Sequence, residues 1–250
     1  AYERFMGISS QSVGHRFVDW LSPAPGLRWL DVGCGNGAFT EMLMARCAPA
    51  AVEGIDPSEP QLVYARQRPA LQAARFRQGD AMALPCPDSS MDVAVMPLVI
   101  FFVPDPAKGV AEMVRVVQPG GVVAAYAWDM VGGGFPYFPL QQALREQGQV
   151  VPSPPSPEAS RLDVLQALWQ GAGLVEVETC EITVQRTYAD FDDYWATVQG
   201  GPSVRATLAA MTPAQVAALQ ERVRSGLPVA ADGSITCSAR ANAVKGRVPR

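Results

Sequence analysis

The stretch that decides the fold is Trp29-Leu-Asp-Val-Gly-Cys-Gly-Asn-Gly-Ala-Phe-Thr40. An apolar run typical of a buried strand ends at Val32, glycines follow at positions 33, 35 and 37, and helical spacing of apolar residues begins at Ala38. A strand, a glycine turn and a helix let a backbone approach a ligand closely, because no Cβ atom stands in the way. The start of the helix adds unpaired N–H groups and a positive dipole end. This stretch therefore predicts a nucleotide-type binding site.

The glycine turn by itself fits more than one interpretation. Residues 33–38 also satisfy the dinucleotide pattern G-x-G-x-x-G/A, and a tight turn without any ligand would show the same glycines. Asp31 separates these interpretations, because it lies just before the glycines at the carboxyl end of the expected strand. A carboxylate there would repel a pyrophosphate, but it would suit a ligand that carries an ammonium or sulfonium group.

The composition limits the class of protein. The 250 residues are 48% hydrophobic, which is enough for one large α/β core with room for insertions. A net charge of −4 without any block of Lys or Arg argues against nucleic acid and anionic membranes as partners. The longest apolar stretch, residues 93–103, is too short to span a bilayer.

The cysteine pattern predicts a reducing compartment. The five cysteines are odd in number and contain no C-x-x-C pair. This pattern favours reduced structural thiols over a disulfide framework or a zinc site, so we expect no metal. The first residues also lack the basic-then-apolar layout of a signal peptide. Together these features predict a cytoplasmic location.

Strand and helix patterns alternate through the first half of the chain. Besides the first strand, strands are expected at 51–56, 74–80, 92–96 and 122–128, and helices within 1–20 and at 38–47, 58–68 and 107–117. Residues 118–121 are expected to form a turn. The spacing is typical of right-handed βαβ units, which predicts a parallel, doubly wound sheet.

Two insertions interrupt this pattern. One lies between a triple glycine at 132–134 and a proline run at 152–157, and the other contains the helix start Thr212-Pro-Ala-Gln215. We expect a single domain over residues 1–250, with the core at about 21–129, 161–184 and 229–247 and cap elements at about 1–20, 130–160 and 185–228. The cap is expected either to be a lid that orders when ligands bind or to be permanently packed.

Two further carboxylates follow expected strands. Asp56 ends the second strand about twenty residues after the glycines, where an acidic residue binds a ribose diol in dinucleotide-binding and related folds. Asp80 ends the third strand and could accept a hydrogen bond from an adenine amino group, with the N–H of Ala81 donating to a ring nitrogen. The simpler alternatives are a turn aspartate before Pro57 and a solvated loop carboxylate.

Taken in order, Asp31 with the glycine turn, Asp56, Asp80 and Pro119-Gly-Gly121 resemble class I S-adenosylmethionine-dependent methyltransferases that act on small molecules, in their type 11-like branch. Residues 2–7 and 232–235 are also similar to the bacterial group that includes quinone-ring methylating enzymes. The resemblance implies an α/β fold with a doubly wound, mostly parallel, seven-stranded Rossmann-like sheet and helical cap insertions.

The resemblance also implies S-adenosylmethionine as the cofactor, S-adenosylhomocysteine as the product, and a set of contacts. It puts Asp31 near the ammonium, the backbone of Gly33, Cys34 and Gly35 along the methionine part, Asp56 and Pro57 at the ribose, Gln61 against the ribose or adenine, Asp80 and Ala81 at the adenine edge, and Met96 near the sulfonium.

The chain departs from this family at the expected site of a base. Many relatives carry a histidine shortly after the fourth strand, whereas residues 98–103 here are wholly apolar. The single histidine, His15, is more often a packed residue than a catalytic one, so the catalytic residues stay unassigned. Without a base, transfer would depend on proximity and orientation.

The acceptor is expected to be a small molecule with apolar or aromatic character. An apolar pocket could form from Phe39, Phe101, Phe102, Tyr126, Trp128 and Phe135, unless these side chains belong to the core. Two alternatives stay open: a catalytically silent S-adenosylmethionine-binding scaffold, and an NAD-dependent oxidoreductase, for which no Tyr-x-x-x-Lys site is found. The sequence does not specify the oligomeric state.

Overall fold

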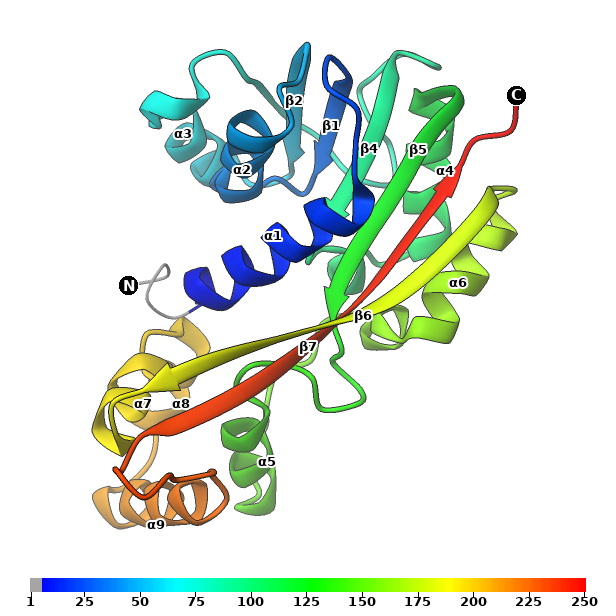
Figure 1. Cartoon of the computed structure of the whole chain (residues 1–250). Coiled ribbons are helices and arrows are strands. Elements are labelled where there is room, and N and C mark those ends of the chain that lie inside the picture. The colour runs from blue at the N-terminus through cyan, green and yellow to red at the C-terminus, as the bar shows by residue number, and fades with distance from the viewer. Residues whose placement is uncertain (1–5) are drawn as a thin grey trace. The chain divides into compact units, whose positions relative to one another are not determined.

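The structure, a computed structural model, describes residues 6–250, apart from the side chains of residues 202 and 203. Most of the resembling stretch 2–7 therefore lies outside the described residues. The strands are β1 (Arg28–Val32), β2 (Ala51–Asp56), β3 (Arg75–Gln78), β4 (Met91–Pro97), β5 (Val117–Trp128), β6 (Val175–Tyr188) and β7 (Ile235–Arg247). They form a seven-stranded sheet in the order β3-β2-β1-β4-β5-β7-β6, and Figure 1 shows β2, β1, β4 and β5 side by side.

The strand directions confirm the predicted fold class. β1 pairs in parallel with β2 and β4, β2 with β3, and β4 with β5, whereas β7 is antiparallel to β5. Because the order reverses between β1 and β4, a crevice for ligands is expected at the carboxyl ends of these strands. The sheet is therefore doubly wound and mostly parallel.

The chain divides into two compact units. The core unit comprises Gly14–Gly132, Pro154–Ile182 and Ala241–Arg250, and the second unit comprises Gly133–Ser153, Thr183–Arg240 and the described residues up to Val13. Most of these boundaries lie within seven residues of the expected division into core and cap. The exception is the last stretch of the core unit, which begins at Ala241 instead of at about 229. The interpretation of the whole chain as one capped domain stays a prediction.

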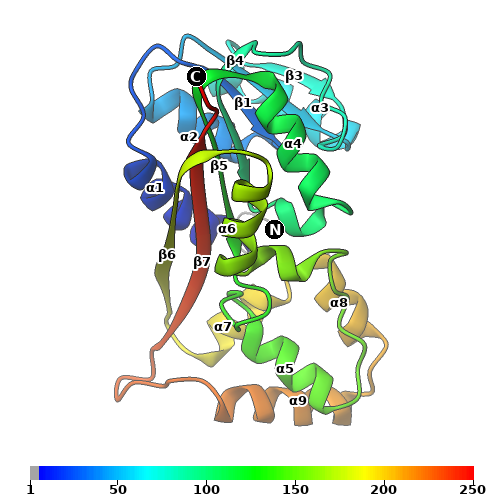
Figure 2. The same cartoon turned by 90° about the vertical axis from the view of Figure 1, so that its right-hand side faces the viewer.

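Helices cover the sheet of the core unit. They are the last part of α1 (Ile8–Leu21), α2 (Ala38–Arg46), α3 (Glu59–Gln67), α4 (Pro106–Val116) and α6 (Leu162–Gly171). Figure 2 shows α4 and α6 together on one side of the strands. Their buried residues Met113 and Trp169 pack against sheet residues such as Leu30, and the indole N–H of Trp169 donates to the Val123 carbonyl at 2.9 Å.

The second unit contains mostly helices. They are α5 (Phe138–Glu146), α7 (Phe191–Val198), α8 (Pro202–Ala209) and α9 (Pro213–Ser225). The predicted start of α9 is correct, because the Thr212 hydroxyl accepts from the Gln215 N–H and the Gln215 side chain accepts from the Thr212 N–H. In the described part of the chain, no helix combines the length and the apolar character needed to cross a bilayer.

Two local expectations were wrong. The expected turn at 118–121 is part of β5, because the pairing with β4 shifts register between Met91 and Val93 and takes up the extra residues as an irregularity. β6 continues to Tyr188, four residues beyond the end of the expected core segment 161–184, since pairing with β7 extends it. The Thr187 and Thr236 hydroxyls lie 2.9 Å apart across the two strands.

Candidate functional site

The glycine turn between β1 and α2 is held against the end of β2. The N–H groups of Gly33 and Cys34 both donate to the Ile55 carbonyl, at 2.7 and 3.1 Å. Gly33 has a φ of +73°, and a Cβ built on it would lie 2.5 Å from a methyl of Val99. Gly35 has a φ of +52°, but a Cβ there would meet no atom within 4 Å. The turn therefore needs glycine at both positions and leaves open space beside Gly35.

Cys34 contributes its backbone to this turn, together with a weak bond in which its thiol donates to the Gly35 carbonyl at 4.0 Å. Its side chain is buried among Leu62, Phe76 and neighbouring apolar residues, and burial strongly raises the pKa of its thiol. Because the N–H groups of Gly33, Cys34 and Gly35 already have partners in the protein, these residues can offer a ligand carbonyl oxygens rather than donors. Carbonyl oxygens are the right partners for an ammonium group.

Asp31 is a fully buried carboxylate, and one of its two oxygens accepts no hydrogen bond. Its Oδ2 accepts a 2.6 Å hydrogen bond from the hydroxyl of Thr40 on α2, and its Oδ1 has no partner. Burial raises the pKa of Asp31 to about 7; the Thr40 hydroxyl opposes this rise and the charge of Asp56 adds to it. A buried carboxylate oxygen without a donor is costly, so the site fits a ligand cation.

Asp56 joins the glycine turn to the start of α3. Its Oδ2 accepts from the Gly35 N–H and its Oδ1 from the Ser58 N–H, both at 2.8 Å. Ser58 is the N-cap residue of α3, but its side chain makes no capping bond. Each carboxylate oxygen of Asp56 keeps a second lone pair, with which it can accept from a ribose hydroxyl. Asp56 is only 9% exposed, so such a bond would be formed where little solvent has access.

The residues that flank Asp56 are less constrained. Pro57 is exposed, and its carbonyl accepts from the Gln78 amide at 2.9 Å. Gln61 is exposed on the first turns of α3. Both therefore have accessible surface close to Asp56, and their assignment to the cofactor stays a prediction.

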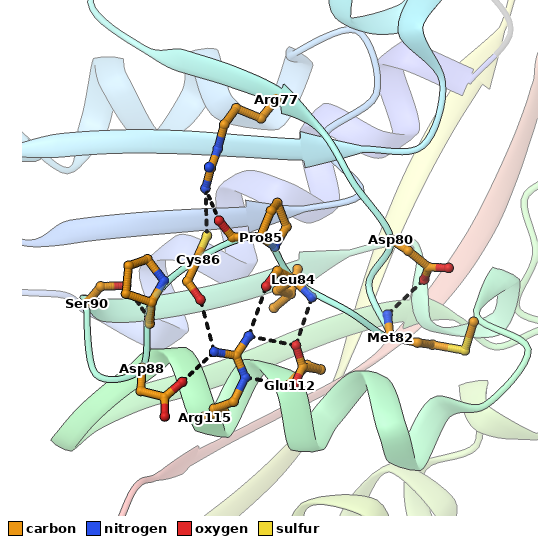
Figure 3. Close-up of polar contacts among 11 residues, drawn as sticks. Arg77, Asp80, Met82, Leu84, Pro85, Cys86, Asp88, Ser90, Glu112 and Arg115 are labelled. Carbon is orange, nitrogen blue, oxygen red and sulfur yellow. Dashed lines mark hydrogen bonds and ion pairs between the residues drawn. The ribbon is translucent and has the colours of Figure 1, made fainter.

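Asp80 opens the loop after β3, at the adenine position implied by the resemblance. Its side chain is exposed, and its Oδ1 accepts from the Met82 N–H at 2.8 Å, as Figure 3 shows. The N–H of Ala83 donates to the Asp80 carbonyl at 3.0 Å, whereas the N–H of half-buried Ala81 is not used in this turn. The geometry leaves the Asp80 carboxylate and the Ala81 backbone accessible to a ligand.

An arginine that sequence reasoning missed braces this loop. Arg115 on α4 donates to the carbonyls of Leu84 and Cys86 at 2.9 Å and pairs with Glu112 and Asp88 (Figure 3). Glu112 in turn accepts from the Leu84 N–H at 2.8 Å, and its hydrogen bonds with Arg115 lower its pKa. Only the tertiary structure brings the arginine to these carbonyls, 31 and 29 residues earlier in the chain.

Met96 lies at the end of β4, and its side chain is fully buried in the hydrophobic core. Its assignment near the sulfonium stays a prediction. Two residues later, Leu98 adopts a φ of +60°, and its N–H donates to the Tyr126 carbonyl at 2.7 Å. A left-handed leucine is strained, and strain of this kind concentrates at functional sites.

The six aromatic residues considered as an acceptor pocket have different surroundings. Phe101 and Trp128 are buried, and Phe39 and Tyr126 pack on Phe17, with ring centroids 6.2 and 4.6 Å away. Phe102 is 60% exposed. His15 is also exposed and lies beside Arg46, which donates to its backbone carbonyl at 2.9 Å.

The second unit has its own apolar cavity of about 110 Å³. Its lining includes Phe135, Tyr137, Leu140, Leu144, Val151 and Val204. Tyr137 is one of these lining residues. Burial raises its pKa to about 12, although a hydrogen bond with Tyr188 opposes the rise. Among the described residues, no group of three or more His, Cys, Asp or Glu side chains is placed to hold a metal ion.

The ends of the first insertion are hydrogen-bonded within their own units. The Gly132 N–H donates to the Asp129 carboxylate at 2.7 Å, and the Gly134 carbonyl accepts from the Arg240 N–H at 2.9 Å. At the other end, Ser156 donates to the carbonyls of Phe101 and Val103. These bonds fit a packed segment at least as well as a hinge, and a mobile lid stays a prediction.

Comparisons with known proteins agree with this geometry. Residues 30–125 match the model of a family described as a methyltransferase domain. The chain is 37% identical over 113 residues to malonyl-[acyl-carrier protein] O-methyltransferase of Serratia marcescens, covering 45% of this chain and 43% of that protein. It is 36% identical over 126 residues to demethylmenaquinone methyltransferase of Desulfitobacterium hafniense, covering 48% and 49%. The alignments thus span about half the length of these curated relatives.

The fold has solved counterparts as well. The YcgJ protein of Bacillus subtilis superimposes with a TM-score of 0.62 at 21% identity, over 96% of this chain and 99% of that one. The sequence match covers the glycine turn and the strands on either side of it, and the seven strands and their mostly parallel directions are those expected from the resemblance. By sequence, residues 30–125 are similar to a methyltransferase domain, and the fold of the chain resembles that of the YcgJ protein.

Proposed function

We propose that this chain binds S-adenosylmethionine in the core unit and transfers its methyl group to a small-molecule acceptor. The observation that supports this most strongly is the unpartnered Oδ1 of buried Asp31, beside a glycine turn with open space at Gly35. A dinucleotide would bring a pyrophosphate to this turn, where the Asp31 carboxylate would repel it. An ammonium group instead meets a carboxylate and carbonyl oxygens.

Different residues of the core unit would bind different parts of the cofactor. Asp31 and the carbonyls of the glycine turn would hold the amino-acid part, Asp56 would accept from the ribose hydroxyls, and Asp80 with Ala81 would bind the adenine edge. When bound, S-adenosylmethionine supplies a methyl group that its sulfonium has already activated. Arg115 would act indirectly, by keeping the loop after Asp80 in one conformation.

Orientation would supply most of the rate enhancement, because neither His15 nor Tyr137 is prepared to act as a base. His15 is exposed and lies against Arg46, and the pKa of Tyr137, raised to about 12, keeps that phenol protonated at neutral pH. Holding two reactants in line can contribute about 7–11 kcal/mol to lowering a barrier. This favours an acceptor whose attacking atom is nucleophilic or readily ionised.

We propose that the acceptor is small and has apolar or aromatic parts. The cavity of the second unit supports this, since the lining residues named above include no charged side chain. The curated relatives carry names that refer to a quinone precursor and to a carrier-bound malonyl group, so the family accepts chemically different molecules. With a net charge of −4 and no basic cluster, nucleic acid is not proposed as a partner.

A thermal melting experiment on the whole chain tests the cofactor. S-adenosylmethionine and S-adenosylhomocysteine at a hundred times their dissociation constants should each stabilise the fold by about 2.7 kcal/mol, whereas NADH should not. Stabilisation by NADH alone would favour an oxidoreductase.

Transfer is tested next with S-adenosylmethionine labelled in its methyl group. The acceptor probes are a prenylated hydroquinone, a malonyl thioester and a small-molecule extract of cells. Label recovered in an organic-soluble product would support the proposal and exclude a silent scaffold. Tight cofactor binding without transfer to any of the three would favour the scaffold.

A further inference from the structure

Thr40 is the polar side chain that the sequence analysis left without a role. It lies on the first turn of α2 and is fully buried. Its hydroxyl donates to Asp31 Oδ2 at 2.6 Å, which is a short bond between a hydroxyl and a carboxylate. Asp31 itself lies in the middle of the sheet, with Gly54 of β2 and Val95 of β4 as its strand neighbours. Neither neighbour offers a side-chain donor.

The surroundings of Asp31 otherwise oppose a negative charge. The charge of Asp56 raises the pKa of Asp31, and the Cys34 thiol is neutral, because burial and both aspartates raise its pKa. Within residues 6–250, no basic side chain pairs with Asp31, and its Oδ1 has no donor. The Thr40 hydroxyl is the one group found to stabilise the ionised form.

We infer that Thr40 is a positioning residue: its hydroxyl holds Oδ2 of Asp31 and leaves Oδ1 to be shared between a proton and the ammonium of the cofactor. The inference rests on the proposed function. Binding of the ammonium then converts the Asp31 carboxylic acid into a carboxylate, and the displaced proton passes to the solvent. Cofactor binding is therefore coupled to the release of a proton.

This coupling makes affinity depend on pH near neutrality. The pKa of Asp31 in the free protein is raised to about 7, so the carboxyl is partly protonated at neutral pH. Below that value, the affinity for an ammonium-bearing ligand should rise with pH, by at most about tenfold per unit, and it should level off above it. Removing the Thr40 hydroxyl should raise the pKa of Asp31 further and move this rise to higher pH.

The experiment is titration calorimetry on the whole chain between pH 5.5 and 8.5, with two probes. S-adenosylhomocysteine carries the ammonium, and 5′-methylthioadenosine keeps the adenosine and the thioether but lacks the amino-acid part. The variants are Thr40→Val, which removes the hydroxyl at similar size, and Thr40→Ser, which keeps it. Two buffers with different heats of ionisation give the number of protons released.

For the wild type, we expect S-adenosylhomocysteine to release a fraction of a proton at pH 7, falling towards zero at pH 8.5. Thr40→Val should bind it about tenfold more weakly at pH 7 and recover part of that loss at higher pH, since one unit of pKa corresponds to a factor of ten. Thr40→Ser should behave like the wild type. Binding of 5′-methylthioadenosine should change in neither variant, which also shows that both are folded.

Three outcomes would overturn the inference. The first is binding of S-adenosylhomocysteine by the wild type without proton release anywhere below pH 7.5, a test that needs no variant. The second is an unchanged pH profile in Thr40→Val. The third is an equal loss of both probes in Thr40→Val, which would make Thr40 merely structural. If the wild type bound neither probe, the proposed function would fail, and this inference with it.

Discussion

The core unit and the second unit place their polar groups differently. In the core unit, the turns after β1, β2 and β3 are held by carboxylates that accept from backbone N–H groups: Asp56 from Gly35 and Ser58, and Asp80 from Met82. In the second unit, aromatic rings pack on one another, as with Tyr188 and Tyr194 at 5.1 Å and Phe191 and Trp195 at 6.0 Å. The loops at the strand ends of the core unit are thus held by directional bonds, whereas this part of the second unit is joined by contacts between aromatic rings.

This difference explains where the family resemblance lies. Hydrogen bonds require particular atoms at particular positions, whereas apolar packing tolerates exchange among side chains of similar volume. The family match at residues 30–125 lies entirely within the core unit. We therefore expect changes in the core unit to alter cofactor binding and changes in the second unit to alter the use of the acceptor.

The largest effect is expected at Gly35. Gly35→Ala would put a methyl group into the open space beside the turn and should lower the affinity for S-adenosylhomocysteine by about a hundredfold, or about 2.7 kcal/mol, in calorimetry. Gly26→Ala is the matched control, because Gly26 also has a positive φ and open space around its Cβ position. Both variants should lose about 1–2 kcal/mol of stability. Equal affinities in the two variants would contradict a ligand at Gly35.

Asp56 should come next. Asp56→Ala is expected to weaken S-adenosylmethionine binding about tenfold to a hundredfold, because hydrogen bonds to a charged group contribute about 1.5–3 kcal/mol. The control is Asp19→Ala, which removes an exposed carboxylate that pairs with Arg46 at 2.6 Å in the same unit. Unchanged affinity in a folded Asp56→Ala protein would exclude Asp56 from the ribose site.

Asp31 should link stability to pH. Its pKa is about 7 in the folded protein, above the ordinary value near 3.9, so the folded state holds more protons and loses stability as pH rises from about 4 to 7. Asp31→Asn avoids this loss, and its melting temperature relative to the wild type should increase across that window by a few degrees in thermal melting without ligand.

Asp92 provides a control of opposite sign. Hydrogen bonds from Arg28 lower its pKa, so it stabilises the folded state above its unfolded pKa and loses that effect as pH falls. Asp92→Asn should therefore lower the melting temperature at neutral pH. If the difference in melting temperature between Asp31→Asn and the wild type did not depend on pH, the pKa of Asp31 would not be raised in the folded protein.

The smallest effect is expected in the second unit. Tyr137→Phe removes a hydroxyl that is bonded to Tyr188 and stays protonated at neutral pH, so it should leave S-adenosylhomocysteine affinity unchanged. With an identified acceptor, kcat should fall by less than about tenfold, a loss smaller than removal of a general base would cause. A fall in kcat beyond about 10⁴-fold would give Tyr137 a catalytic role. It would also contradict the expectation that the two units have separate functions.

Much of the fold could be predicted because its signals are local. Strand β2 begins and ends at the predicted residues, and α2 and α9 begin at theirs, since apolar runs, glycines and caps act within a few residues. The turn expected at 118–121 was wrong because pairing with β4 overrode the local preference of Pro-Gly-Gly. The extension of β6 was missed because it depends on β7, about fifty residues further along the chain.

The sequence by itself determined the resemblance to methyltransferases, the mostly parallel, doubly wound sheet and the carboxylates that follow its strands, because each depends on residues close together in the chain. Only the tertiary structure decided how those groups are held: that Thr40 caps one oxygen of Asp31, that the other oxygen has no partner, and that Arg115 braces the loop after Asp80. It also turned Met96 into the core. Burial and the direction of a side chain arise from packing between distant segments, and no local pattern in the chain records them.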